Sequence, residues 1–370
     1  MSNPFRAFRK LPAFKKFLVV LTLVFFVAAC GVAGFWFAES KAAEKLQRVF
    51  SPLGTLLTGK PEEPTDFPNP LNGVLYKASE AAAWKDLLPL AVIIENHTEA
   101  RPQSGMQRAE ITYEVLAEGG ITRTMNIYLA QETALGPVRS NRTYFLDWVS
   151  EYGAGYSHVG GSPEAQSKVQ SYKIKDLDQF SVGSEAYQRV SSRFAPHNVY
   201  TSTAKLRAAA KRRGYSGPVQ IAMWNFKDKE ATSGARPAKF NVKINFGSSS
   251  LPDYRVEWRY DKVTNTYLRL NGGVAHLDAT NKKQLSAKNI IVQYLVTTPD
   301  PSGHSRLRMQ TRGSGKAIIF RDGRAYSANW RKSTLTSRTR FYDTKGNEIA
   351  LNRGKIWIEI VPTGSLVRYN

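Results

Sequence analysis

The first third of the chain contains the stretch that decides the fold, Tyr113-Glu-Val-Leu-Ala-Glu-Gly-Gly-Ile-Thr-Arg123. The residues on either side alternate well enough to form strands, Ile111 to Ala117 and Ile121 to Ala130. Glu118-Gly119-Gly120 would turn the chain between them. The apolar run Leu88 to Glu95 just before this stretch suits a buried strand. We therefore predict a hairpin within a buried sheet.

Two helices are predicted after the hairpin. Ser140 is placed to cap a helix that has an apolar face and ends near Gly153. Tyr156 to Val159 then returns as a strand. After a glycine turn, Ser162 is the N-cap of a second helix and Pro163 its first residue. The order strand, helix, strand, helix predicts a mixed α/β domain, to which we assign residues 75–225.

From about Ala238 the pattern changes to short strands separated by turn signals, which predicts an antiparallel, β-rich domain over residues 226–370. We expect few contacts across this boundary. Gly313-Ser-Gly-Lys316 is interpreted as a turn between strands, since it lacks the other residues of a phosphate-binding loop. The large aromatic residues are predicted to be core, with a sugar-stacking platform as the alternative. These aromatic residues are Trp258, Tyr260, Trp330 and Trp357.

Several glycine-punctuated motifs occur together in an order that resembles the YerB-like family of bacterial cell-surface proteins, which includes proteins described as lipoproteins. The resemblance covers roughly residues 70 to 365 and implies an N-terminal and a C-terminal domain outside the cytoplasm, without a settled activity. The motifs that carry it are Arg101-Pro-Gln-Ser-Gly105, Gly136-Pro-Val-Arg-Ser-Asn-Arg142, His158-Val-Gly-Gly-Ser-Pro-Glu-Ala165, Ala195-Pro-His-Asn-Val-Tyr-Thr201, Val256-Glu-Trp-Arg-Tyr-Asp261, Asn329-Trp330 and Gly354-Lys-Ile-Trp357.

The N-terminus predicts a membrane anchor. Residues 1–16 contain five of the chain's cations, and the uncharged run 17–38 that follows would span about 33 Å as a helix, enough to cross a bilayer. The one-sided positive charge places the N-terminus in the cytoplasm and residues 39–370 outside. Residues 39–74 are expected to be an extended spacer, because they include four closely spaced prolines, Pro61, Pro64, Pro68 and Pro70.

Cys30 leaves the nature of the anchor open. Val27-Ala28-Ala29-Cys30 reads like a lipoprotein signal, in which the cysteine is acylated after cleavage. The residues beyond Cys30 stay apolar to Ala38, which favours an uncleaved signal anchor. A third interpretation is a cysteine that merely sits in a membrane helix. As the only cysteine of the chain it excludes an intramolecular disulfide.

The charge of the chain points to an anionic partner. Its 52 Lys and Arg exceed its 30 Asp and Glu by 22. Outside the cytoplasm such an excess favours an anionic wall polymer, a lipid or an envelope protein. Nucleic acid is an unlikely partner there, and no nucleic-acid-binding motif is present.

Arg139 and Arg142 accompany the two predicted helix starts, at Ser140 and at Gly161-Ser162. Helix N-termini and guanidinium groups both attract phosphate or carboxylate, so one hypothesis is a cationic pocket for an anionic group. The alternative is structural: the serines only cap, and the arginines pair with nearby glutamates.

Glu114 and Glu118 fall on one side of the predicted strand. Two such carboxylates could hold a divalent cation or share acid and base roles. Pairing with Arg101 or Arg123 is the simpler explanation and the one we favour.

His197 follows Pro196 in a loop and is the histidine best placed for a site, although a loop histidine that caps a backbone carbonyl is more common. His97 and His158 accompany it in the N-terminal domain, but no His-x-x-x-His or Cys-x-x-Cys spacing favours a zinc site. No cofactor or metal is therefore predicted. Nucleophile-elbow and dinucleotide-binding motifs are missing from the sequence.

Two functional hypotheses are compatible with these sequence features. The first is a non-enzymatic binding or assembly factor with a basic outer surface. The second is an enzyme acting on a phosphorylated, pyrophosphate-linked envelope substrate, since Gly119 to Arg142 is faintly similar to the LytR-CpsA-Psr wall-polymer transferases. The distinguishing feature is whether Glu118, Arg123, Arg139 and Arg142 meet in one cleft with the carboxylate unpaired.

Overall fold

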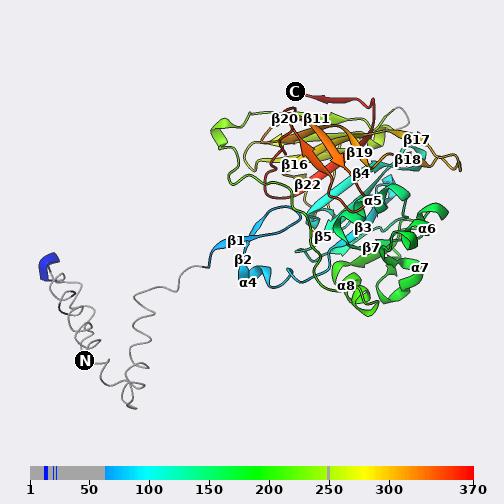
Figure 1. Ribbon diagram of the computed structural model, residues 1–370, viewed down its shortest axis with the longest axis horizontal. Coiled ribbons are helices and arrows are strands. Elements are labelled where there is room, and N and C mark those ends of the chain that lie inside the picture. The colour runs from blue at the N-terminus through cyan, green and yellow to red at the C-terminus, as the bar shows by residue number, and fades with distance from the viewer. Residues whose placement is uncertain (1–11, 16–19, 21, 23–62, 248–250) are drawn as a thin grey trace, which may run out of the picture. The chain divides into compact units, whose positions relative to one another are not determined.

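A ten-stranded sheet runs through the computed structural model, which describes residues 12–15, 20, 22, 63–247 and 251–370 (Figure 1). The chain divides into two units, Met1–Glu63 and Pro64–Asn370, and every element considered below lies in the second. The predicted span 17–38 and Cys30 fall almost wholly outside the described residues. Among the residues that are described, no helix is both long and apolar enough to span a bilayer.

The ten-stranded sheet contains the predicted hairpin near its middle. Strands β4 and β5 pair antiparallel through a 3₁₀ turn, η3 (Glu118–Gly120), as the sequence predicts. The predicted buried strand becomes β3, which pairs antiparallel with β5. Every residue of these three strands is buried, as expected for strands covered on both faces. In spatial order the strands are β21 (Arg340–Tyr342), β20 (Arg324–Lys332), β19 (Gly313–Arg321), β16 (Asn289–Leu295), β22 (Ile356–Pro362), β4 (Ile111–Leu116), β5 (Thr122–Tyr128), β3 (Leu90–Glu95), β7 (Gly155–His158) and β8 (Lys175–Asp178).

This sheet joins the two predicted domains. Strand β22, near the C-terminus, pairs parallel with β4, with Ile356 opposite Ile111 and Ile360 opposite Val115. Strand β22 also pairs parallel with β16. The expectation of few contacts across the boundary is therefore wrong, and so is the expectation that the C-terminal region is purely antiparallel. The residues on both sides of the boundary share one sheet because β22, which is buried over all but its last residue, pairs with a strand from each side.

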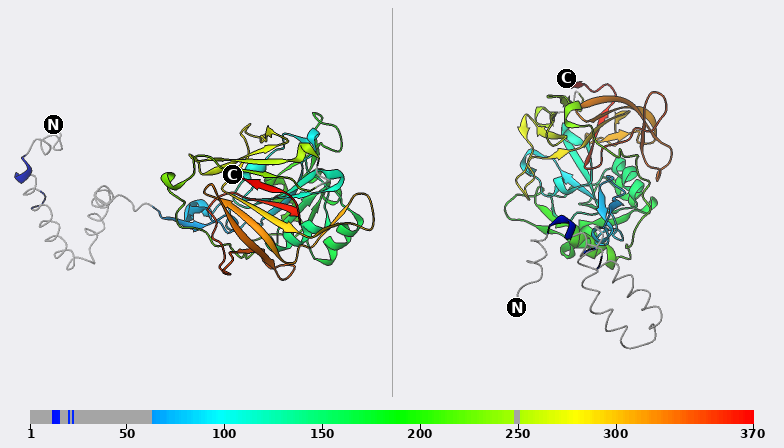
Figure 2. Two further views of the ribbon diagram at one scale, coloured as in Figure 1. Left: turned by 90° about the horizontal axis from the view of Figure 1, so that it is seen from above. Right: turned by 90° about the vertical axis from the view of Figure 1, so that its left-hand side faces the viewer.

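Helices cover both faces of the sheet around β3. Alternate residues of β3 belong to opposite sides: Ala91 and Ile93 pack in the core that contains α5, and Val92 and Ile94 in the core that contains α8. Figures 1 and 2 show these helices gathered around the N-terminal half of the sheet. The helices are α4 (Ala78–Ala81), α5 (Thr143–Tyr152), α6 (Pro163–Ser171), α7 (Gln179–Val182) and α8 (Thr203–Arg212).

The ends of α5 and α6 test the predicted caps. Helix α6 begins as expected, with the Ser162 hydroxyl accepting the Ala165 N–H and Pro163 as first residue. Helix α5 ends at Gly153, whose φ of 53° suits a glycine. The Ser140 cap is wrong, because α5 starts later and its N-cap is Arg142, with no side-chain cap.

A second sheet of six strands packs against the C-terminal half of the first and gives this region its predicted β-rich character. Val242, Val256 and Trp258 face inward and share a core with Ile290 and Trp357. The strands are β14 (Val274–Ala275), β13 (Thr266–Asn271), β12 (Val256–Asp261), β11 (Asn241–Ile244) and β23 (Val367–Tyr369) in order, with β15 (Ser286–Ala287) against β13. Smaller sheets are formed by β1 (Thr65–Pro68) with β2 (Leu75–Lys77), by β6 (Ala134–Leu135), β10 (Val199–Ser202) and β9 (Gln188–Arg189), and by β17 (Thr297–Pro299) with β18 (Leu307–Met309).

Two details of the C-terminal region follow. The prediction that these large aromatic residues are core is confirmed, since Trp258 and Trp357 are fully buried and Tyr260 and Trp330 nearly so. None of these four rings is therefore free to form a sugar platform. The predicted turn at Gly313 to Lys316 is wrong, because these residues begin the long strand β19 and pair with β20.

Candidate functional site

Three of the residues predicted for an anion pocket meet at the β4–β5 turn. Glu118 forms an ion pair with the Nε of Arg142 and lies 3.5 Å from Nη2 of the buried Arg123. Burial opposes the charge of Glu118, but the two guanidinium groups outweigh it and lower the pKa of this carboxyl. Arg123 also donates to the Ser140 carbonyl at 3.0 Å. The carboxylate is therefore paired, as the structural alternative predicts.

The remaining predicted residues have separate partners. Arg139 places Nε 3.0 Å from Oε1 of Glu95. Gly161 lies against Asn141 in a β-bridge, and Ser162 caps α6. Arg101 donates to the Asn96 carbonyl at 3.0 Å and lies over the ring of Tyr254.

Glu114 and Glu118 do not act together. Glu114 is fully buried and accepts from Nη2 of Arg269 at 2.5 Å and from the Thr122 hydroxyl at 2.7 Å. The prediction that Glu114 pairs with Arg101 or Arg123 is wrong, since its partner comes from β13 in the other half of the chain. For Glu118, the predicted pairing with Arg123 is confirmed.

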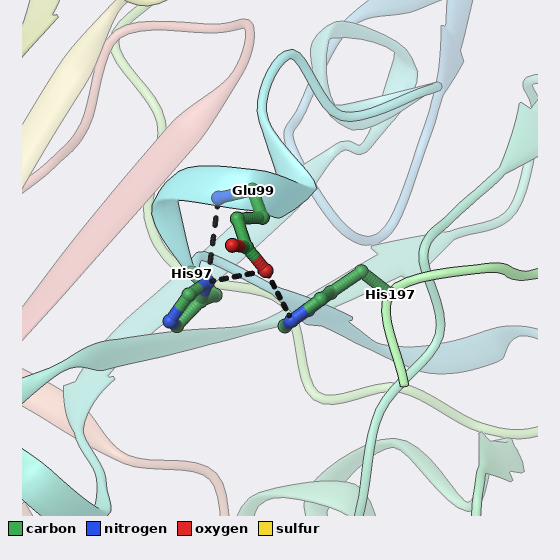
Figure 3. Close-up of side chains that lie close together, drawn as sticks. All are labelled: His97, Glu99 and His197. Carbon is green, nitrogen blue, oxygen red and sulfur yellow. Dashed lines mark hydrogen bonds and ion pairs between the residues drawn. The ribbon is translucent and has the colours of Figure 1, made fainter. Parts of the chain in front are cut away.

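His197 has neighbours that the sequence did not reveal (Figure 3). Its Nδ1 lies 2.8 Å from Oε2 of Glu95, and its Nε2 lies 3.1 Å from Oε2 of Glu99. The ring stacks on His97, with centroids 4.6 Å apart. Both ring nitrogens thus face carboxylates rather than a backbone carbonyl. His97, Glu99 and His197 are also the described residues whose donor atoms lie close enough for a metal ion.

A basic groove on the outer face of the second sheet is a site that the sequence analysis missed. It is a cavity of about 530 Å³ to which Lys243 of β11, Arg255 before β12 and Arg368 of β23 all contribute. Lys243 is directly opposite Arg368 on one side and Glu257 on the other. The other lining residues are Ile244, Asn245, Pro252, Val256, Glu257, Gly272, Gly273 and Leu366.

Strand alternation explains why these cations point outward. Val242, Ile244 and Val256 are buried beneath the sheet, so Lys243 and Arg255, between or beside them, are exposed. Within the described ranges, neither they nor Arg368 has a carboxylate within 4 Å, and the one acid of the groove, Glu257, pairs with Arg259 at 2.8 Å. The alternation around Lys243 was visible in the sequence, but strands so far apart gave no sign of being neighbours.

Two family models and a relative of known sequence match the chain. The model described as "Protein of unknown function (DUF3048) N-terminal domain" matches residues 77–216, and the corresponding C-terminal domain model matches residues 242–358. "Putative lipoprotein YerB" of Bacillus subtilis (strain 168) is 32% identical over 279 residues, which cover 74% of this chain and 81% of that protein.

The fold is shared with a solved structure as well. The crystal structure of the YerB protein from Bacillus subtilis has a TM-score of 0.73 and 28% identity, over 82% of this chain and 99% of that one. Sequence and structure agree over both halves of the chain, in the order that the motifs predicted. The chain therefore belongs to the YerB-like, DUF3048 family.

Proposed function

We propose that the protein is a membrane-anchored, extracytoplasmic binding protein that holds an anionic wall polymer in the basic groove formed by Lys243, Arg255 and Arg368. The observation that carries this proposal is the absence of ion-pair partners for all three cations within the described part of the chain. A cation without a carboxylate partner keeps its full charge available for a ligand.

The arrangement favours a polymer with repeated charges. Lys243 and Arg368 lie on adjacent strands, which run about 4.8 Å apart, so their charges form a row across the sheet. The predicted end of the spacer at residue 74 is wrong, because β1 lies within it and Leu71 is buried in the core. The part of the spacer before Pro64 would still hold the folded unit away from the bilayer, which favours wall polymer over lipid. The cations around Glu118 are less suitable, because that carboxylate already pairs with Arg123 and Arg142. The same pairing removes the free carboxylate on which the enzyme alternative depends.

The location rests on two supports. Five N-terminal cations precede the uncharged run 17–38, which orients that run with residues 39–370 outside. The similarity to a protein named as a lipoprotein agrees with attachment to the membrane. The groove lies on the part of the chain that would then face the wall.

The test measures binding of the full-length protein, in detergent micelles, to fluorescent poly(glycerol phosphate). Charged hydrogen bonds contribute about 1.5 to 3 kcal/mol each, so Lys243→Gln/Arg255→Gln/Arg368→Gln should weaken binding more than tenfold. The matched control Lys211→Gln/Lys85→Gln/Lys345→Gln removes the same charge from exposed positions elsewhere. It should change the affinity only slightly. Equal losses in the two triple variants would mean diffuse attraction and would overturn the groove as the site.

A further inference from the structure

Two imidazoles and a carboxylate converge beside β3, away from the basic groove. The donor atoms of His97, Glu99 and His197 all lie within 4.8 Å of one another. His97 and Glu99 come from the start of η1 (Thr98–Ala100), directly after β3, and His197 from the loop before β10. Figure 3 shows the Glu99 carboxylate beside the two rings, with one oxygen facing a nitrogen of each.

His197 is held in one orientation by a buried carboxylate. Glu95, which is 1% exposed, lies 2.8 Å from Nδ1 of His197 through Oε2 and 3.0 Å from Arg139 through Oε1. Since Arg139 already balances the charge of Glu95, a neutral imidazole that donates through Nδ1 satisfies this contact. A carboxylate in this position is the usual support of a metal-binding histidine, because it fixes the tautomer that leaves Nε2 free.

His97, Glu99 and His197 each offer one donor atom toward the same space. Nε2 of His197 lies 3.1 Å from Oε2 of Glu99. Nδ1 of His97 accepts the Glu99 N–H at 3.3 Å, a long hydrogen bond that a metal at Nδ1 would replace, and it lies 4.0 Å from the same carboxylate oxygen. A metal ion in this space would take one donor atom from each of the three residues.

We propose that His97, Glu99 and His197 bind a divalent transition metal, with Zn²⁺ as the best fit, and that Glu95 positions His197. Two imidazole nitrogens and one carboxylate oxygen form a donor set that suits zinc, whereas magnesium and calcium prefer oxygen alone.

The distances fit a metal after a small adjustment. Ligands about 2.1 Å from a tetrahedral zinc lie about 3.4 Å apart, close to the 3.1 Å between His197 and Glu99. His97 must move closer to both partners, since its Nδ1 lies 4.0 Å from Glu99 and the donor atoms of the cluster lie within 4.8 Å of one another. Its side chain is 35% exposed and that of Glu99 71%, so both have room. Their exposure also leaves a fourth coordination position open to solvent.

The metal would link two loops that Arg193 already connects. Arg193 donates to the Glu99 carbonyl at 2.5 Å and to the Pro102 carbonyl at 2.9 Å, which ties the loop before β10 to the segment after β3. A zinc ion between His197 and Glu99 would fix the same junction through side chains.

Titration of metal into the full-length protein tests the proposal. The protein is purified in detergent without a histidine tag, stripped with a chelator and titrated with ZnCl₂ by calorimetry at neutral pH, and Co²⁺ is added separately to record its visible absorption. We expect one ion per chain and a cobalt spectrum of low coordination number. Loss of supporting carboxylates typically costs 10- to 100-fold in metal affinity, so His97→Ala and Glu99→Gln, which remove direct ligands, should cost at least as much.

Matched controls separate the site from general effects. His304→Ala and Glu132→Gln alter an exposed histidine and an exposed glutamate elsewhere and should bind Zn²⁺ like the natural protein. Circular dichroism of each variant reports whether it is folded. Failure of the folded natural protein to bind zinc would assign the contact to a protonated His197 and overturn the proposal. Binding that survives both His97→Ala and Glu99→Gln would overturn it too.

Discussion

Glu114 and Arg269 form a fully buried ion pair between residues 155 positions apart, with Oε2 and Nη2 2.5 Å from each other. The guanidinium group lies over the rings of Trp258 and Trp357, at 5.4 and 4.7 Å from their centroids. A second carboxyl, Glu359, lies 3.8 Å from the other side of Arg269. Burial and the neighbouring Glu114 raise the pKa of Glu359 well above its ordinary value. Glu114 is the carboxyl in direct contact with Arg269.

Two glutamates in one network are therefore expected to respond differently to the same change. Glu114→Gln leaves the buried charge of Arg269 without its partner and should lower the free energy of unfolding by about 3–5 kcal/mol. Glu359→Gln replaces an uncharged carboxyl with an amide and should cost much less. Urea unfolding of both variants at pH 7 measures the difference. Similar losses of stability from the two variants would contradict the role of Glu114 as the charge partner of Arg269.

The shared sheet predicts how residues 64–370 unfold. Because β22 pairs with β4 and Arg269 binds Glu114, unfolding of the C-terminal half exposes the centre of the N-terminal half. We expect one cooperative transition, with calorimetric and van't Hoff enthalpies in agreement. Two separate heat-absorption peaks would instead favour the independent domains that the sequence pattern suggests.

The sequence correctly predicted those strands, turns and helix ends that residues close together in the chain determine. Alternation and the Gly119-Gly120 turn predicted β4 and β5, and the Ser162-Pro163 pair predicted the start of α6. Partners distant in the chain could not be predicted, because the sequence of a buried strand such as β22 does not show which strand it pairs with. Glu114 looked like a partner for nearby arginines for the same reason. His97 and His197, 100 positions apart, likewise share no local spacing.

The cluster at the β4–β5 turn is expected to be structural. Arg142 pairs with Glu118, and the side chains are 15% and 22% exposed, so the pair is largely shielded from water. Arg142→Gln should lower the free energy of unfolding by about 1–3 kcal/mol, because Glu118 loses a charged donor. Binding of poly(glycerol phosphate) by the folded variant should be unchanged. A loss of binding without a loss of stability would restore the predicted pocket.

Asp322 should make stability sensitive to acid. Burial opposes its charge, but hydrogen bonds from Lys227, Asn265 and Asn352 outweigh that effect and lower its pKa to about 2. A carboxyl whose pKa is lowered on folding stabilises the folded state. This stabilisation is complete at pH values above 3.8, the ordinary pKa, and is lost as the pH falls through about 2. Asp322→Asn should therefore unfold more readily than the natural protein at pH 7, and the gap should narrow between pH 4 and pH 2. Thermal unfolding across this range measures it, and a constant gap would contradict the assigned cause.

Substitution of Cys30 distinguishes an uncleaved signal anchor from a lipoprotein signal. If residues 17–38 are an uncleaved anchor, Cys30→Ala should leave the protein in the membrane fraction at its full length, because the apolar run alone holds it there. If the cysteine is acylated after cleavage, the natural protein should take up a radiolabelled fatty acid, and the variant should lose that label and keep its uncleaved signal. A phosphatase that is active only outside the cytoplasm, fused after Asn370, reports the orientation and should be active in both cases. Inactivity of a stable fusion would overturn the extracytoplasmic location, and with it the wall polymer as the ligand of the basic groove.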